Sequence, residues 1–478
     1  MAHDTVLLVN PNRMRPPIGP VALDYLAAAL TASGYEPVLC DLTFADDWQS
    51  TLARAIHDAQ PAAVGITIRN LDDAYFASQD FVLEQTADVI RRATALSDAP
   101  VVLGGVGFSI APGPILEYTG AHYGIAGEGE RAFPDLLACL AAGGEPHEVP
   151  GAVFRSRDNG IVCVPPVPCN LAALAPSARR FADNARYFDE GGQAGIETKR
   201  GCDRPCVYCV DPVSKGRTMR VRPPEDVAAE FRALLDLGID AVHLCDSEFN
   251  LPPAHAHAVC EALVRSGVAG SMRWYAYASP TPFDGDLARA MAGAGCVGIN
   301  FGVDHADAAM LERLGRSHRA DDNRRTAEAC RDAGLAVMFD LLFGSPGETP
   351  DSIARAIESI RGLPVDRVGL SCGVRVYPGT PLAASIRAQG PIAGNPNLYG
   401  TVTGNEDLLR PVFYVDGAVG EDIHRLVWAL AGDDPRFLAA NPDEADRNYN
   451  YNDNSALSQA IRSGARGAYW DILRKLDG

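Results

Sequence analysis

Short apolar runs alternate with amphipathic segments along the first 140 residues of the chain. TVLLV at residues 5–9 is the first run, and the next segment repeats apolar side chains at helical spacing through Val21, Leu23, Leu26 and Leu30. Further runs follow at similar intervals, near residues 36–42, 62–68, 100–105 and 122–126. Because strands that alternate with helices form a parallel sheet covered on both faces, the pattern predicts a doubly wound, Rossmann-like α/β domain over residues 1–145.

Residues 146–190 break this pattern, because alanine, glycine and proline are abundant there. We expect a linker that also packs across the first domain. Strand and helix patterns resume over residues 191–390, where six apolar runs end in polar or turn residues. They predict a partial (β/α)6 barrel with its chemistry at the carboxyl ends of the strands. Residues 391–478 carry aromatic side chains and two or three helical patterns, and we expect a helical cap that excludes water.

The composition is that of a soluble globular protein of two or three domains, with 478 residues, 47% hydrophobic and 22% charged. Its formal net charge of −19 disfavours nucleic acid as a partner, although KRGCDR and KGRTMRVR are locally basic. No apolar run approaches the ~18 residues that a membrane span needs, so we expect no membrane partner. The first residues lack the charged start and apolar core of a signal peptide, which predicts a cytoplasmic protein.

Three of the twelve cysteines stand close together in the stretch ETKRGCDRPCVYC, as Cys202, Cys206 and Cys209. The others lie apart in apolar surroundings, and most of them are expected to be buried thiols. Four thiolates would complete a structural zinc site or saturate a [4Fe–4S] cluster, whereas three leave one iron open. The CxxxCxxC spacing therefore indicates a cluster with one vacant iron, and a chance or zinc-binding trio is the alternative.

This loop resembles that of the radical SAM superfamily, in which S-adenosylmethionine (SAM) binds the fourth iron through its amino and carboxylate groups. Tyr208, directly before the third cysteine, matches the aromatic position of that motif. The resemblance implies SAM contacts at the strand ends, namely Tyr208, Asp246, Ser247, Glu248, Tyr277, Ser279, Asp304, Gly344, Pro346 and Arg375. A helix cap is the alternative for Glu248, and a structural ion pair is the alternative for Arg375.

Two glycine-rich segments, GGVGFS at 104–109 and GEGE at 127–130, follow predicted strands near the turn IRN. No GxGxxG dinucleotide fingerprint occurs, and tight turns are the purely structural explanation of these glycines. Together the segments resemble the cobalamin-binding domain that precedes many radical SAM domains. The implied cobalamin contacts are Asn10, Pro11, Arg69, Asn70, Gly104, Gly105, Gly107, Phe108, Ser109, Gly127, Glu128, Gly129 and Glu130.

The same resemblance bears on the cobalt ligand. The DxHxxG motif, which supplies a cobalt-binding histidine in cobalamin mutases, is absent. Arg69 stands where related proteins place a residue that faces the lower side of the cobalt. Arginine is a poor metal ligand because it stays protonated. We therefore expect a five-coordinate or water-bound cobalt.

Across nearly the whole chain the sequence resembles the cobalamin-dependent radical SAM enzymes, many of which are methyltransferases. The resemblance implies a [4Fe–4S] cluster, SAM and methylcobalamin as cofactors, and an electron donor such as flavodoxin or ferredoxin. It also implies methyl transfer to an unactivated carbon of a small or peptide-derived natural-product intermediate. Tyr377, Tyr449, Tyr451 and Trp470 are candidate substrate contacts, and a core role is the alternative for the three in the tail.

Other activities stay open on the sequence alone. Some relatives use cobalamin for oxidative cyclisation or ring rearrangement, and others methylate indole-like carbons by a polar route. A methylthiotransferase acting on RNA is disfavoured by the acidic charge and by the lack of a second cysteine trio in the first domain. A non-catalytic cobalamin or redox sensor is disfavoured by the complete series of SAM-contact segments.

Overall fold

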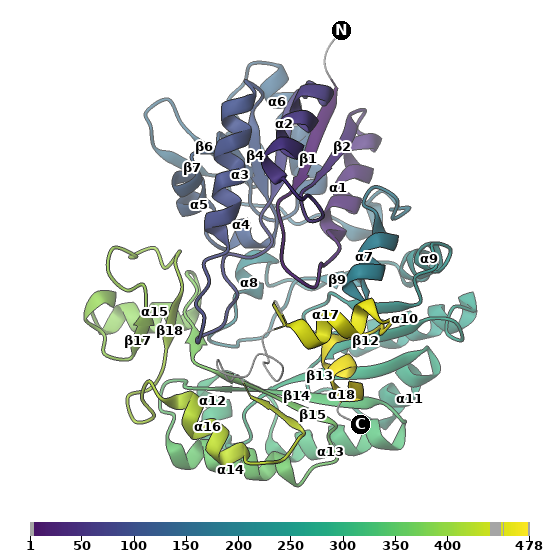
Figure 1. The fold of residues 1–478 in the computed structure, drawn as a ribbon, viewed down its shortest axis with the longest axis vertical. Helices are drawn as coiled ribbons and strands as arrows, with labels where there is room; N and C mark the ends of the chain where they lie inside the picture. Colours follow the sequence, from purple (N-terminus) through teal and green to yellow (C-terminus); the bar gives the residue numbers. More distant parts are fainter. Residues whose placement is uncertain (1–3, 440–450, 453, 477–478) are drawn as a thin grey trace.

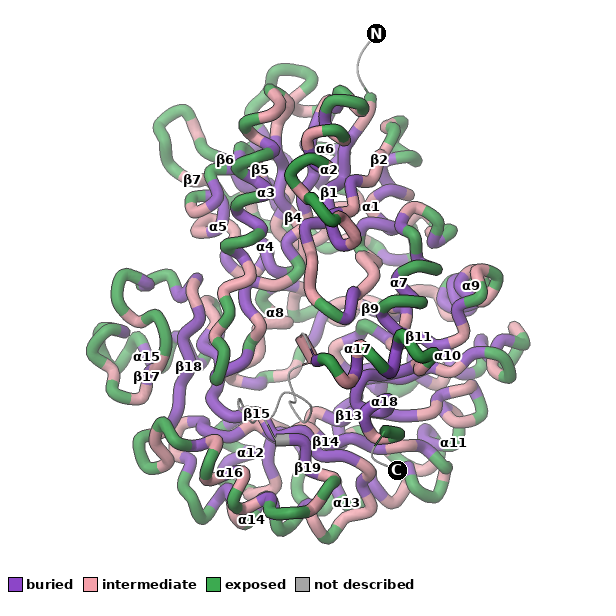
Figure 2. Tube along the Cα trace, in the orientation of Figure 1, coloured by how far each residue is buried: buried purple, intermediate pink, exposed green. Residues whose placement is uncertain are grey.

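Two parallel sheets, one above the other in Figure 1, form the framework of the molecule. The computed structural model describes residues 4–439, 451–452 and 454–476. The upper sheet forms the amino-terminal domain and the lower sheet forms an open barrel. The strands of both sheets are largely buried, as Figure 2 shows. None of the described helices is long and apolar enough to cross a membrane.

The upper sheet has the strand order β2-β1-β3-β4-β5-β6-β7. Its parallel strands are β1 (Thr5–Asn10), β2 (Glu36–Asp41), β3 (Ala63–Thr67), β4 (Val101–Gly104) and β5 (Tyr123–Ile125). Continuous apolar runs such as residues 6–9 are fully buried, because helices cover both faces of a parallel sheet. The order 2-1-3-4-5 is that of a doubly wound sheet, and it confirms the predicted fold class.

Helices cover both faces of the upper sheet. Helices α1 and α6 pack together on one face, while α2, α3 and α5 cover the other. Their bounds are α1 (Val21–Ala32), α2 (Trp48–Ala59), α3 (Leu83–Leu96), α5 (Pro112–Thr119) and α6 (Gly129–Ala141), with the short α4 (Val106–Ile110) directly after β4. This arrangement leaves the carboxyl ends of the strands facing the barrel (Figure 1).

The upper sheet continues past residue 145, where the sequence predicted the end of the first domain. β6 (Ala152–Arg155) pairs antiparallel with β5, and β7 (Ile161–Cys163) pairs antiparallel with β6. Both strands lie inside the segment predicted as a linker, because its abundant alanine, glycine and proline favour a loop. The rest of that segment contains η1 (Leu171–Ala173) and α7 (Asn184–Gly191).

The lower sheet has the order β19-β15-β14-β13-β12-β11-β8 and is parallel throughout. Its strands are β8 (Ala194–Ile196), β11 (Ala241–Leu244), β12 (Arg273–Ala278), β13 (Cys296–Asp304), β14 (Ala336–Phe343), β15 (Arg367–Cys372) and β19 (Phe437–Ala439). The first six are the predicted strands, and the tail adds the seventh. The edge strands β8 and β19 do not pair with each other, so the barrel is open.

Helices follow the barrel strands and pack around the sheet (Figure 1). They are α9 (Pro224–Leu235), α10 (Pro253–Ser266), α11 (Gly285–Gly293), α12 (Ala308–Arg313), α13 (Ala320–Asp332) and α14 (Pro350–Arg361). Helix α9 begins with two prolines and two acidic residues, all of which suit the first turn of a helix. Its buried face carries Val227, Phe231 and Leu234, at the spacing that the sequence predicted.

The tail mixes helices with short strands, so a purely helical cap does not describe it. Its helices are α16 (Ile423–Ala431), α17 (Ser455–Arg462) and α18 (Tyr469–Leu476), and α15 (Pro381–Gln389) lies directly before it. A small antiparallel sheet joins β16 (Val374–Arg375) to β17 (Leu398–Gly400) and β18 (Val412–Tyr414). Helix α16 packs on α14 outside the barrel, whereas α17 packs on α7 between the two sheets (Figure 1).

A buried cluster of charges joins the upper domain to the barrel. The Arg179 side chain is 1% exposed, with Nε 2.9 Å from Asp24 Oδ2 and Nη1 2.7 Å from Glu230 Oε1. The Tyr25 hydroxyl donates to Glu230 Oε1 over 2.8 Å, and Arg222 Nη1 lies 2.6 Å from Glu230 Oε2. Since α1, the linker and α9 each contribute a charge, the cluster fixes how the two domains sit together.

Replacing Arg179 with methionine should destabilise the protein, because Asp24 and Glu230 would stay buried without this cation. Breaking a buried pair costs about 3–5 kcal/mol, and thermal denaturation should show earlier unfolding. Arg265→Met is the control, because Arg265 forms an exposed ion pair of 2.9 Å with Glu225. We expect the control to change stability by less than about 1 kcal/mol. Equal losses in both variants would contradict a structural role for the cluster.

Candidate active site

The three clustered cysteines lie in the loop between β9 (Lys199–Arg200) and α8 (Asp211–Ser214). Cys202 and Cys206 are each 7% exposed, and Cys209 is partly buried. Burial raises the pKa of Cys209, and nearby negative charges, including those of Cys202 and Cys206, raise it further. Cys202 and Cys206 therefore lie within electrostatic range of Cys209, although no three such side chains of the described residues are already arranged around a metal position.

Backbone hydrogen bonds fix the path of this loop. Cys202 N donates to Gly216 O over 3.0 Å, and Val207 N donates to Leu314 O over 3.0 Å. Gly201 has a φ of +88°, and a Cβ there would lie 2.2 Å from a backbone oxygen. Only glycine fits this position, which explains its place in the RGC sequence. The motif thus encodes the shape of the loop as well as its thiols.

A buried arginine that sequence reasoning missed lies beside the thiols. Arg316 Nη1 donates to Cys206 Sγ over 3.0 Å and lies 3.5 Å from Glu248 Oε1, while Nε is 3.2 Å from Asp304 Oδ2. The Tyr208 hydroxyl donates to Asp304 Oδ2 over 2.5 Å. Arg316 follows a short helix without any motif, so no sequence signal marked it. The predicted residues Tyr208, Glu248 and Asp304 thus meet around it.

Three other predicted SAM contacts are engaged in holding the barrel strands. Asp246 Oδ1 accepts a hydrogen bond from Thr198 N over 2.8 Å, which joins the ends of β11 and β8. Ser279 N donates to Asn250 Oδ1 over 2.9 Å. The Ser247 hydroxyl donates to the carboxylate of Asp211 in α8. Protein contacts alone account for these positions, and contact with SAM stays a prediction for them.

Backbone groups of the turn after β14 form several hydrogen bonds. Gly344 has a φ of +100°, and its carbonyl accepts from Asp416 N over 3.0 Å. Gly347 N donates to Asp416 Oδ2 over 2.7 Å, so one aspartate closes the turn around Pro346. Gly344 and Pro346 lie at the carboxyl end of β14, and their contact with SAM stays a prediction.

Arg375 and Tyr377 are both engaged with the amino-terminal domain. Arg375 Nε donates to Asp72 Oδ2 over 2.8 Å, and both side chains are buried. The Tyr377 hydroxyl donates to Asp72 Oδ1 over 3.3 Å, and the Arg375 guanidinium lies 4.5 Å from the centre of the Tyr377 ring. Arg375 therefore forms the structural ion pair that was the alternative to a SAM contact. Its charge is already paired, and contact with SAM stays a prediction for Arg375.

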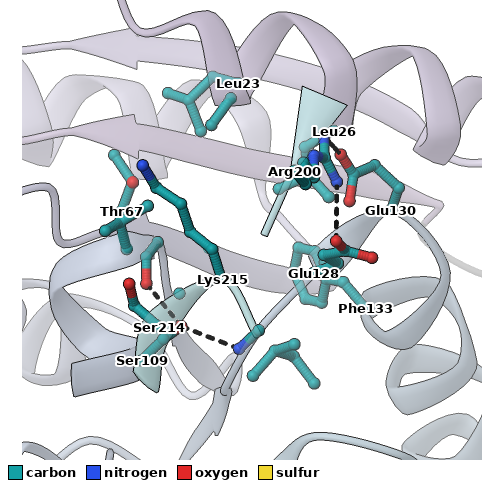
Figure 3. A pocket seen from close by; sticks show the side chains of 18 of the residues that line it. Leu23, Leu26, Thr67, Ser109, Glu128, Glu130, Phe133, Arg200, Ser214 and Lys215 are labelled. Atoms are coloured by element: carbon teal, nitrogen blue, oxygen red, sulfur yellow. Dashed lines mark hydrogen bonds and ion pairs between the residues drawn. The ribbon is translucent and has the colours of Figure 1, made fainter. Parts of the chain in front are cut away.

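A cavity of about 170 Å³ lies between the upper sheet and the barrel (Figure 3). The upper sheet lines it with Thr67, Gly104, Gly105, Ser109, Gly127, Glu128, Gly129 and Glu130. The cysteine region and barrel line it with Glu197, Lys199, Arg200, Ser214, Lys215, Cys245 and Ser247. A deeper apolar part, between α1 and α6, is lined by Leu8, Leu23, Leu26 and Phe133. Both domains therefore build one site.

The two glutamates of the GEGE segment form ion pairs across the domain boundary (Figure 3). Arg200 Nη2 lies 2.5 Å from Glu130 Oε1, and Arg220 Nη1 pairs with Glu128 Oε1. Burial alone would raise the pKa of Glu130, but Arg200 lowers it overall. Both glutamates line the cavity as predicted, and they also fasten the upper sheet to the cysteine loop.

Not every residue of the GGVGFS segment faces the cavity. Phe108 is fully buried, and a Cβ at Gly124 would lie 2.2 Å from its ring, so Phe108 is a core residue rather than a cofactor contact. A Cβ at Gly105 or Gly107 would lie 2.6 or 2.9 Å from Ile68 O. These two glycines therefore allow two loops to pack together. A Cβ at Gly104, in contrast, would lie no closer than 4.0 Å to another atom.

The strand ends of β1 and β3 hold the remaining predicted cobalamin residues. Asn10 is 2% exposed, and its Nδ2 donates to the Tyr187 hydroxyl over 2.8 Å, which ties β1 to α7. Pro11, Arg69 and Asn70 line a second, more polar cavity of about 300 Å³. Asn10 thus has a structural partner, whereas Pro11, Arg69 and Asn70 line a cavity.

Side chains from both domains and from the tail meet at the barrel mouth. The charge of Arg69 acts on Tyr469, Cys245 and Tyr277, which places it near the end of β12 and the start of α18. The rings of Tyr451 and Tyr469 are 5.5 Å apart between centres. The Tyr277 side chain is 44% exposed, as expected of a group that borders open space. An aromatic mouth therefore surrounds one arginine.

Only part of the predicted substrate set lies at this mouth. Trp470 is 3% exposed, and its ring packs edge-on against Tyr275 at 6.2 Å, so it is a core residue. Tyr469, one position earlier, takes the place at the mouth, because adjacent helical residues point about 100° apart. Tyr451 lies within electrostatic range of Asp340 and Tyr277, and a substrate contact stays a prediction for it. Tyr449 lies outside the described residues.

Comparisons with known proteins agree with this two-domain site. Residues 196–360 match the radical SAM superfamily, and residues 13–137 match the B12 binding domain. The chain is 34% identical to tryptophan 2-C-methyltransferase of Streptomyces laurentii, over 80% of this chain and 75% of the relative. It is 26% identical to an uncharacterized methyltransferase of Pyrococcus horikoshii, over 76% of this chain and 77% of that protein.

Solved structures extend the likeness to the whole chain. The radical SAM methyltransferase TsrM from Kitasatospora setae, bound to tryptophan and a SAM analog, superposes with a TM-score of 0.93 at 31% identity, covering 99% of this chain and 98% of that one. The same enzyme with cobalamin and a [4Fe–4S] cluster gives 0.90 at 30% identity, covering 100% and 98% of the two chains. These matches confirm the family that the motifs indicated. The chain belongs to the cobalamin-dependent radical SAM methyltransferases.

Proposed function

We propose that this protein transfers a methyl group from SAM, through a cobalamin, to a carbon of an indole, with tryptophan or a close derivative as the substrate. The shared cavity carries the proposal, because the upper sheet and the cysteine region line it together. A methyl donor bound at the cysteine loop and a cobalamin held by the upper sheet would meet there. The indole is supported by the similarity to proteins named for, or bound to, tryptophan.

The cysteine loop suits a [4Fe–4S] cluster with one open iron. Its three thiols come from one short loop, and Arg316 donates to Cys206 Sγ over 3.0 Å. Hydrogen bonds of this kind to cluster sulfur tune the potential of the cluster. When bound, the cluster supplies the iron that holds SAM. We assign the SAM contacts to Tyr208, Glu248 and Asp304, because these side chains surround the loop.

The upper side of the cavity suits cobalamin. Its deep part between α1 and α6 is apolar, which fits the flat aromatic tail of that cofactor. Gly104 leaves free space in front of the backbone, so a large ring can approach closely. When bound, cobalamin supplies a cobalt atom that accepts a methyl group and passes it on. Arg69 stays protonated, so we propose that the cobalt has no ligand from the protein.

The barrel mouth suits an indole that carries an amino acid backbone. Tyr277, Tyr451 and Tyr469 offer aromatic surface, which packs favourably against a flat ring. The Tyr277 side chain is 44% exposed, and its phenol is protonated at neutral pH, so it can donate a hydrogen bond to a ligand. Asp340 acts on Tyr277 and Tyr451, and Arg69 adds the opposite charge. The charges of Asp340 and Arg69 would balance the ammonium and the carboxylate of a tryptophan substrate.

The first test is the product itself. Purified enzyme, reconstituted without oxygen and given tryptophan with methyl-labelled SAM, should yield a labelled C-methyltryptophan by mass spectrometry. The indole carbon is itself nucleophilic, so S-adenosylhomocysteine should form without matching 5′-deoxyadenosine. One 5′-deoxyadenosine per methyl group would instead indicate methylation of an unactivated carbon by hydrogen abstraction. Cyclised or rearranged product without methyl label would contradict methyl transfer.

Cys206→Ala should separate the two cofactors. The variant should lose cluster iron and reduce methyl transfer to background, because two cysteines hold a cluster poorly. Its cobalamin content should stay near that of the wild type, since the upper sheet provides most of that side of the cavity. Cys163→Ala, at an exposed cysteine of β7, should keep both cofactors. Equal loss of both cofactors in Cys206→Ala would show that the domains do not bind them separately.

Arg69→His tests the cobalt environment. The substitution brings a neutral imidazole to a place where only a guanidinium stands, and imidazole binds metals readily. The paramagnetic resonance spectrum of the Co(II) form should then show splitting by a nitrogen nucleus, with the wild type and Arg69→Gln showing none. A spectrum identical to that of the wild type would place residue 69 away from the cobalt.

A further inference from the structure

Lysine is rare in this chain, and its positions are not random. The sequence has 39 arginines and three lysines, Lys199, Lys215 and Lys475. Lys199 and Lys215 both line the cavity between the two domains, whereas Lys475 lies on the last helix. In a protein that uses arginine almost everywhere else, two ammonium groups at one cavity indicate a need for a small cation there. An ammonium is a compact point charge, unlike the broad guanidinium fork.

The two cavity lysines differ in their partners. Lys215 Nζ lies 3.0 Å from Asp211 Oδ2, so its charge is balanced inside the protein. Lys199 is 3% exposed, and in the part of the chain that the structure describes its ammonium has no hydrogen bond and no ion pair. Burying a charge without a partner is costly. Lys199 therefore presents an unbalanced positive charge to the cavity.

Two of the carboxylates near Lys199 already have other cations, and a third, Asp246, accepts hydrogen bonds from Thr198 N, the Thr198 hydroxyl and Lys199 N. Glu248 lies 3.5 Å from Arg316, and Asp211 lies 3.0 Å from Lys215. Lys199 influences both of these carboxylates and also Cys202, the first cysteine of the loop. Its ammonium thus stands between the cysteine loop and the cavity, where an additional anion would be stabilised.

We propose that Lys199 binds the carboxylate of SAM and so positions the methyl donor between the cysteine loop and the cobalamin side of the cavity. The inference rests on the proposed function, because it requires SAM at this boundary. The methyl-bearing sulfur of SAM is positive, so the carboxylate is the group that a cation can hold, and its two oxygens could be shared between Lys199 and the iron. A carboxylate held at Lys199 would anchor one end of SAM at the domain boundary.

The test compares two ligands that differ in one group. SAM and decarboxylated SAM are titrated into reconstituted holoenzyme without oxygen, and the dissociation constants are measured by calorimetry. Lys199→Met should weaken SAM binding on the order of tenfold to a hundredfold, which is the worth of one charged hydrogen bond. The same variant should bind decarboxylated SAM as the wild type does. Lys199→Arg, which keeps the charge, should recover part of the affinity for SAM.

Lys475→Met is the matched control, because it makes the same substitution at an exposed lysine of α18. It should bind both ligands as the wild type does. Equal weakening of SAM and decarboxylated SAM in Lys199→Met would overturn the proposal, since it would indicate a disturbed fold. Unchanged SAM affinity with a more negative midpoint potential of the cluster would also overturn it, and would assign Lys199 to the cluster thiolates.

The proposed function can fail separately from this inference. Wild-type enzyme that binds SAM but methylates no indole would contradict the proposed substrate. The difference in SAM affinity between the wild type and Lys199→Met would still stand. Wild-type enzyme that methylates tryptophan while Lys199→Met binds SAM normally would contradict the role of Lys199 alone.

Discussion

Two sheet edges that face each other across one cavity are the constraint on which the rest of this structure depends. In parallel sheets the loops at the carboxyl ends of the strands carry the ligands. Here two such edges are held together by buried ion pairs, Arg200 with Glu130 and Arg179 with Asp24 and Glu230. Removing one partner of a buried pair is costly, so the distance between the edges is set by the fold. A methyl group that passes between two bound cofactors needs that fixed distance.

The same ion pairs explain the basic segments of an acidic protein. KRGCDR and KGRTMRVR stand out in a chain of net charge −19. In the fold, Arg200 and Arg220 pair with glutamates of the upper sheet, and Arg222 pairs with Glu230. These positive charges therefore serve the contact between domains and the cavity. Lys199 is the exception, since its charge is turned to the cavity without a partner among the described residues.

The features that could be predicted from the sequence are local ones. Apolar runs and helical spacing depend on neighbours a few residues apart, and they were sufficient for both sheets and for six of the seven barrel strands. The spacing of Cys202, Cys206 and Cys209 identified the loop, because ligands from a single loop must lie close in the chain. The short strands β6, β7 and β19 were missed. β6 and β7 lie in a segment whose alanine, glycine and proline content favours a loop, and β19 lies in a tail whose pattern favours helices.

The direction of individual side chains was decided by tertiary contacts. Arg375 meets Asp72 from 303 positions away, and Arg316 meets Cys206 from 110 positions away. Trp470 fills the core while Tyr469 lies at the mouth, because the packing of α18 sets which side of the helix faces inward. By itself the sequence determined the fold class, the cysteine loop and the family. Which polar groups are already paired, and which charge is left for a ligand, depended on partners that only folding brings within contact distance.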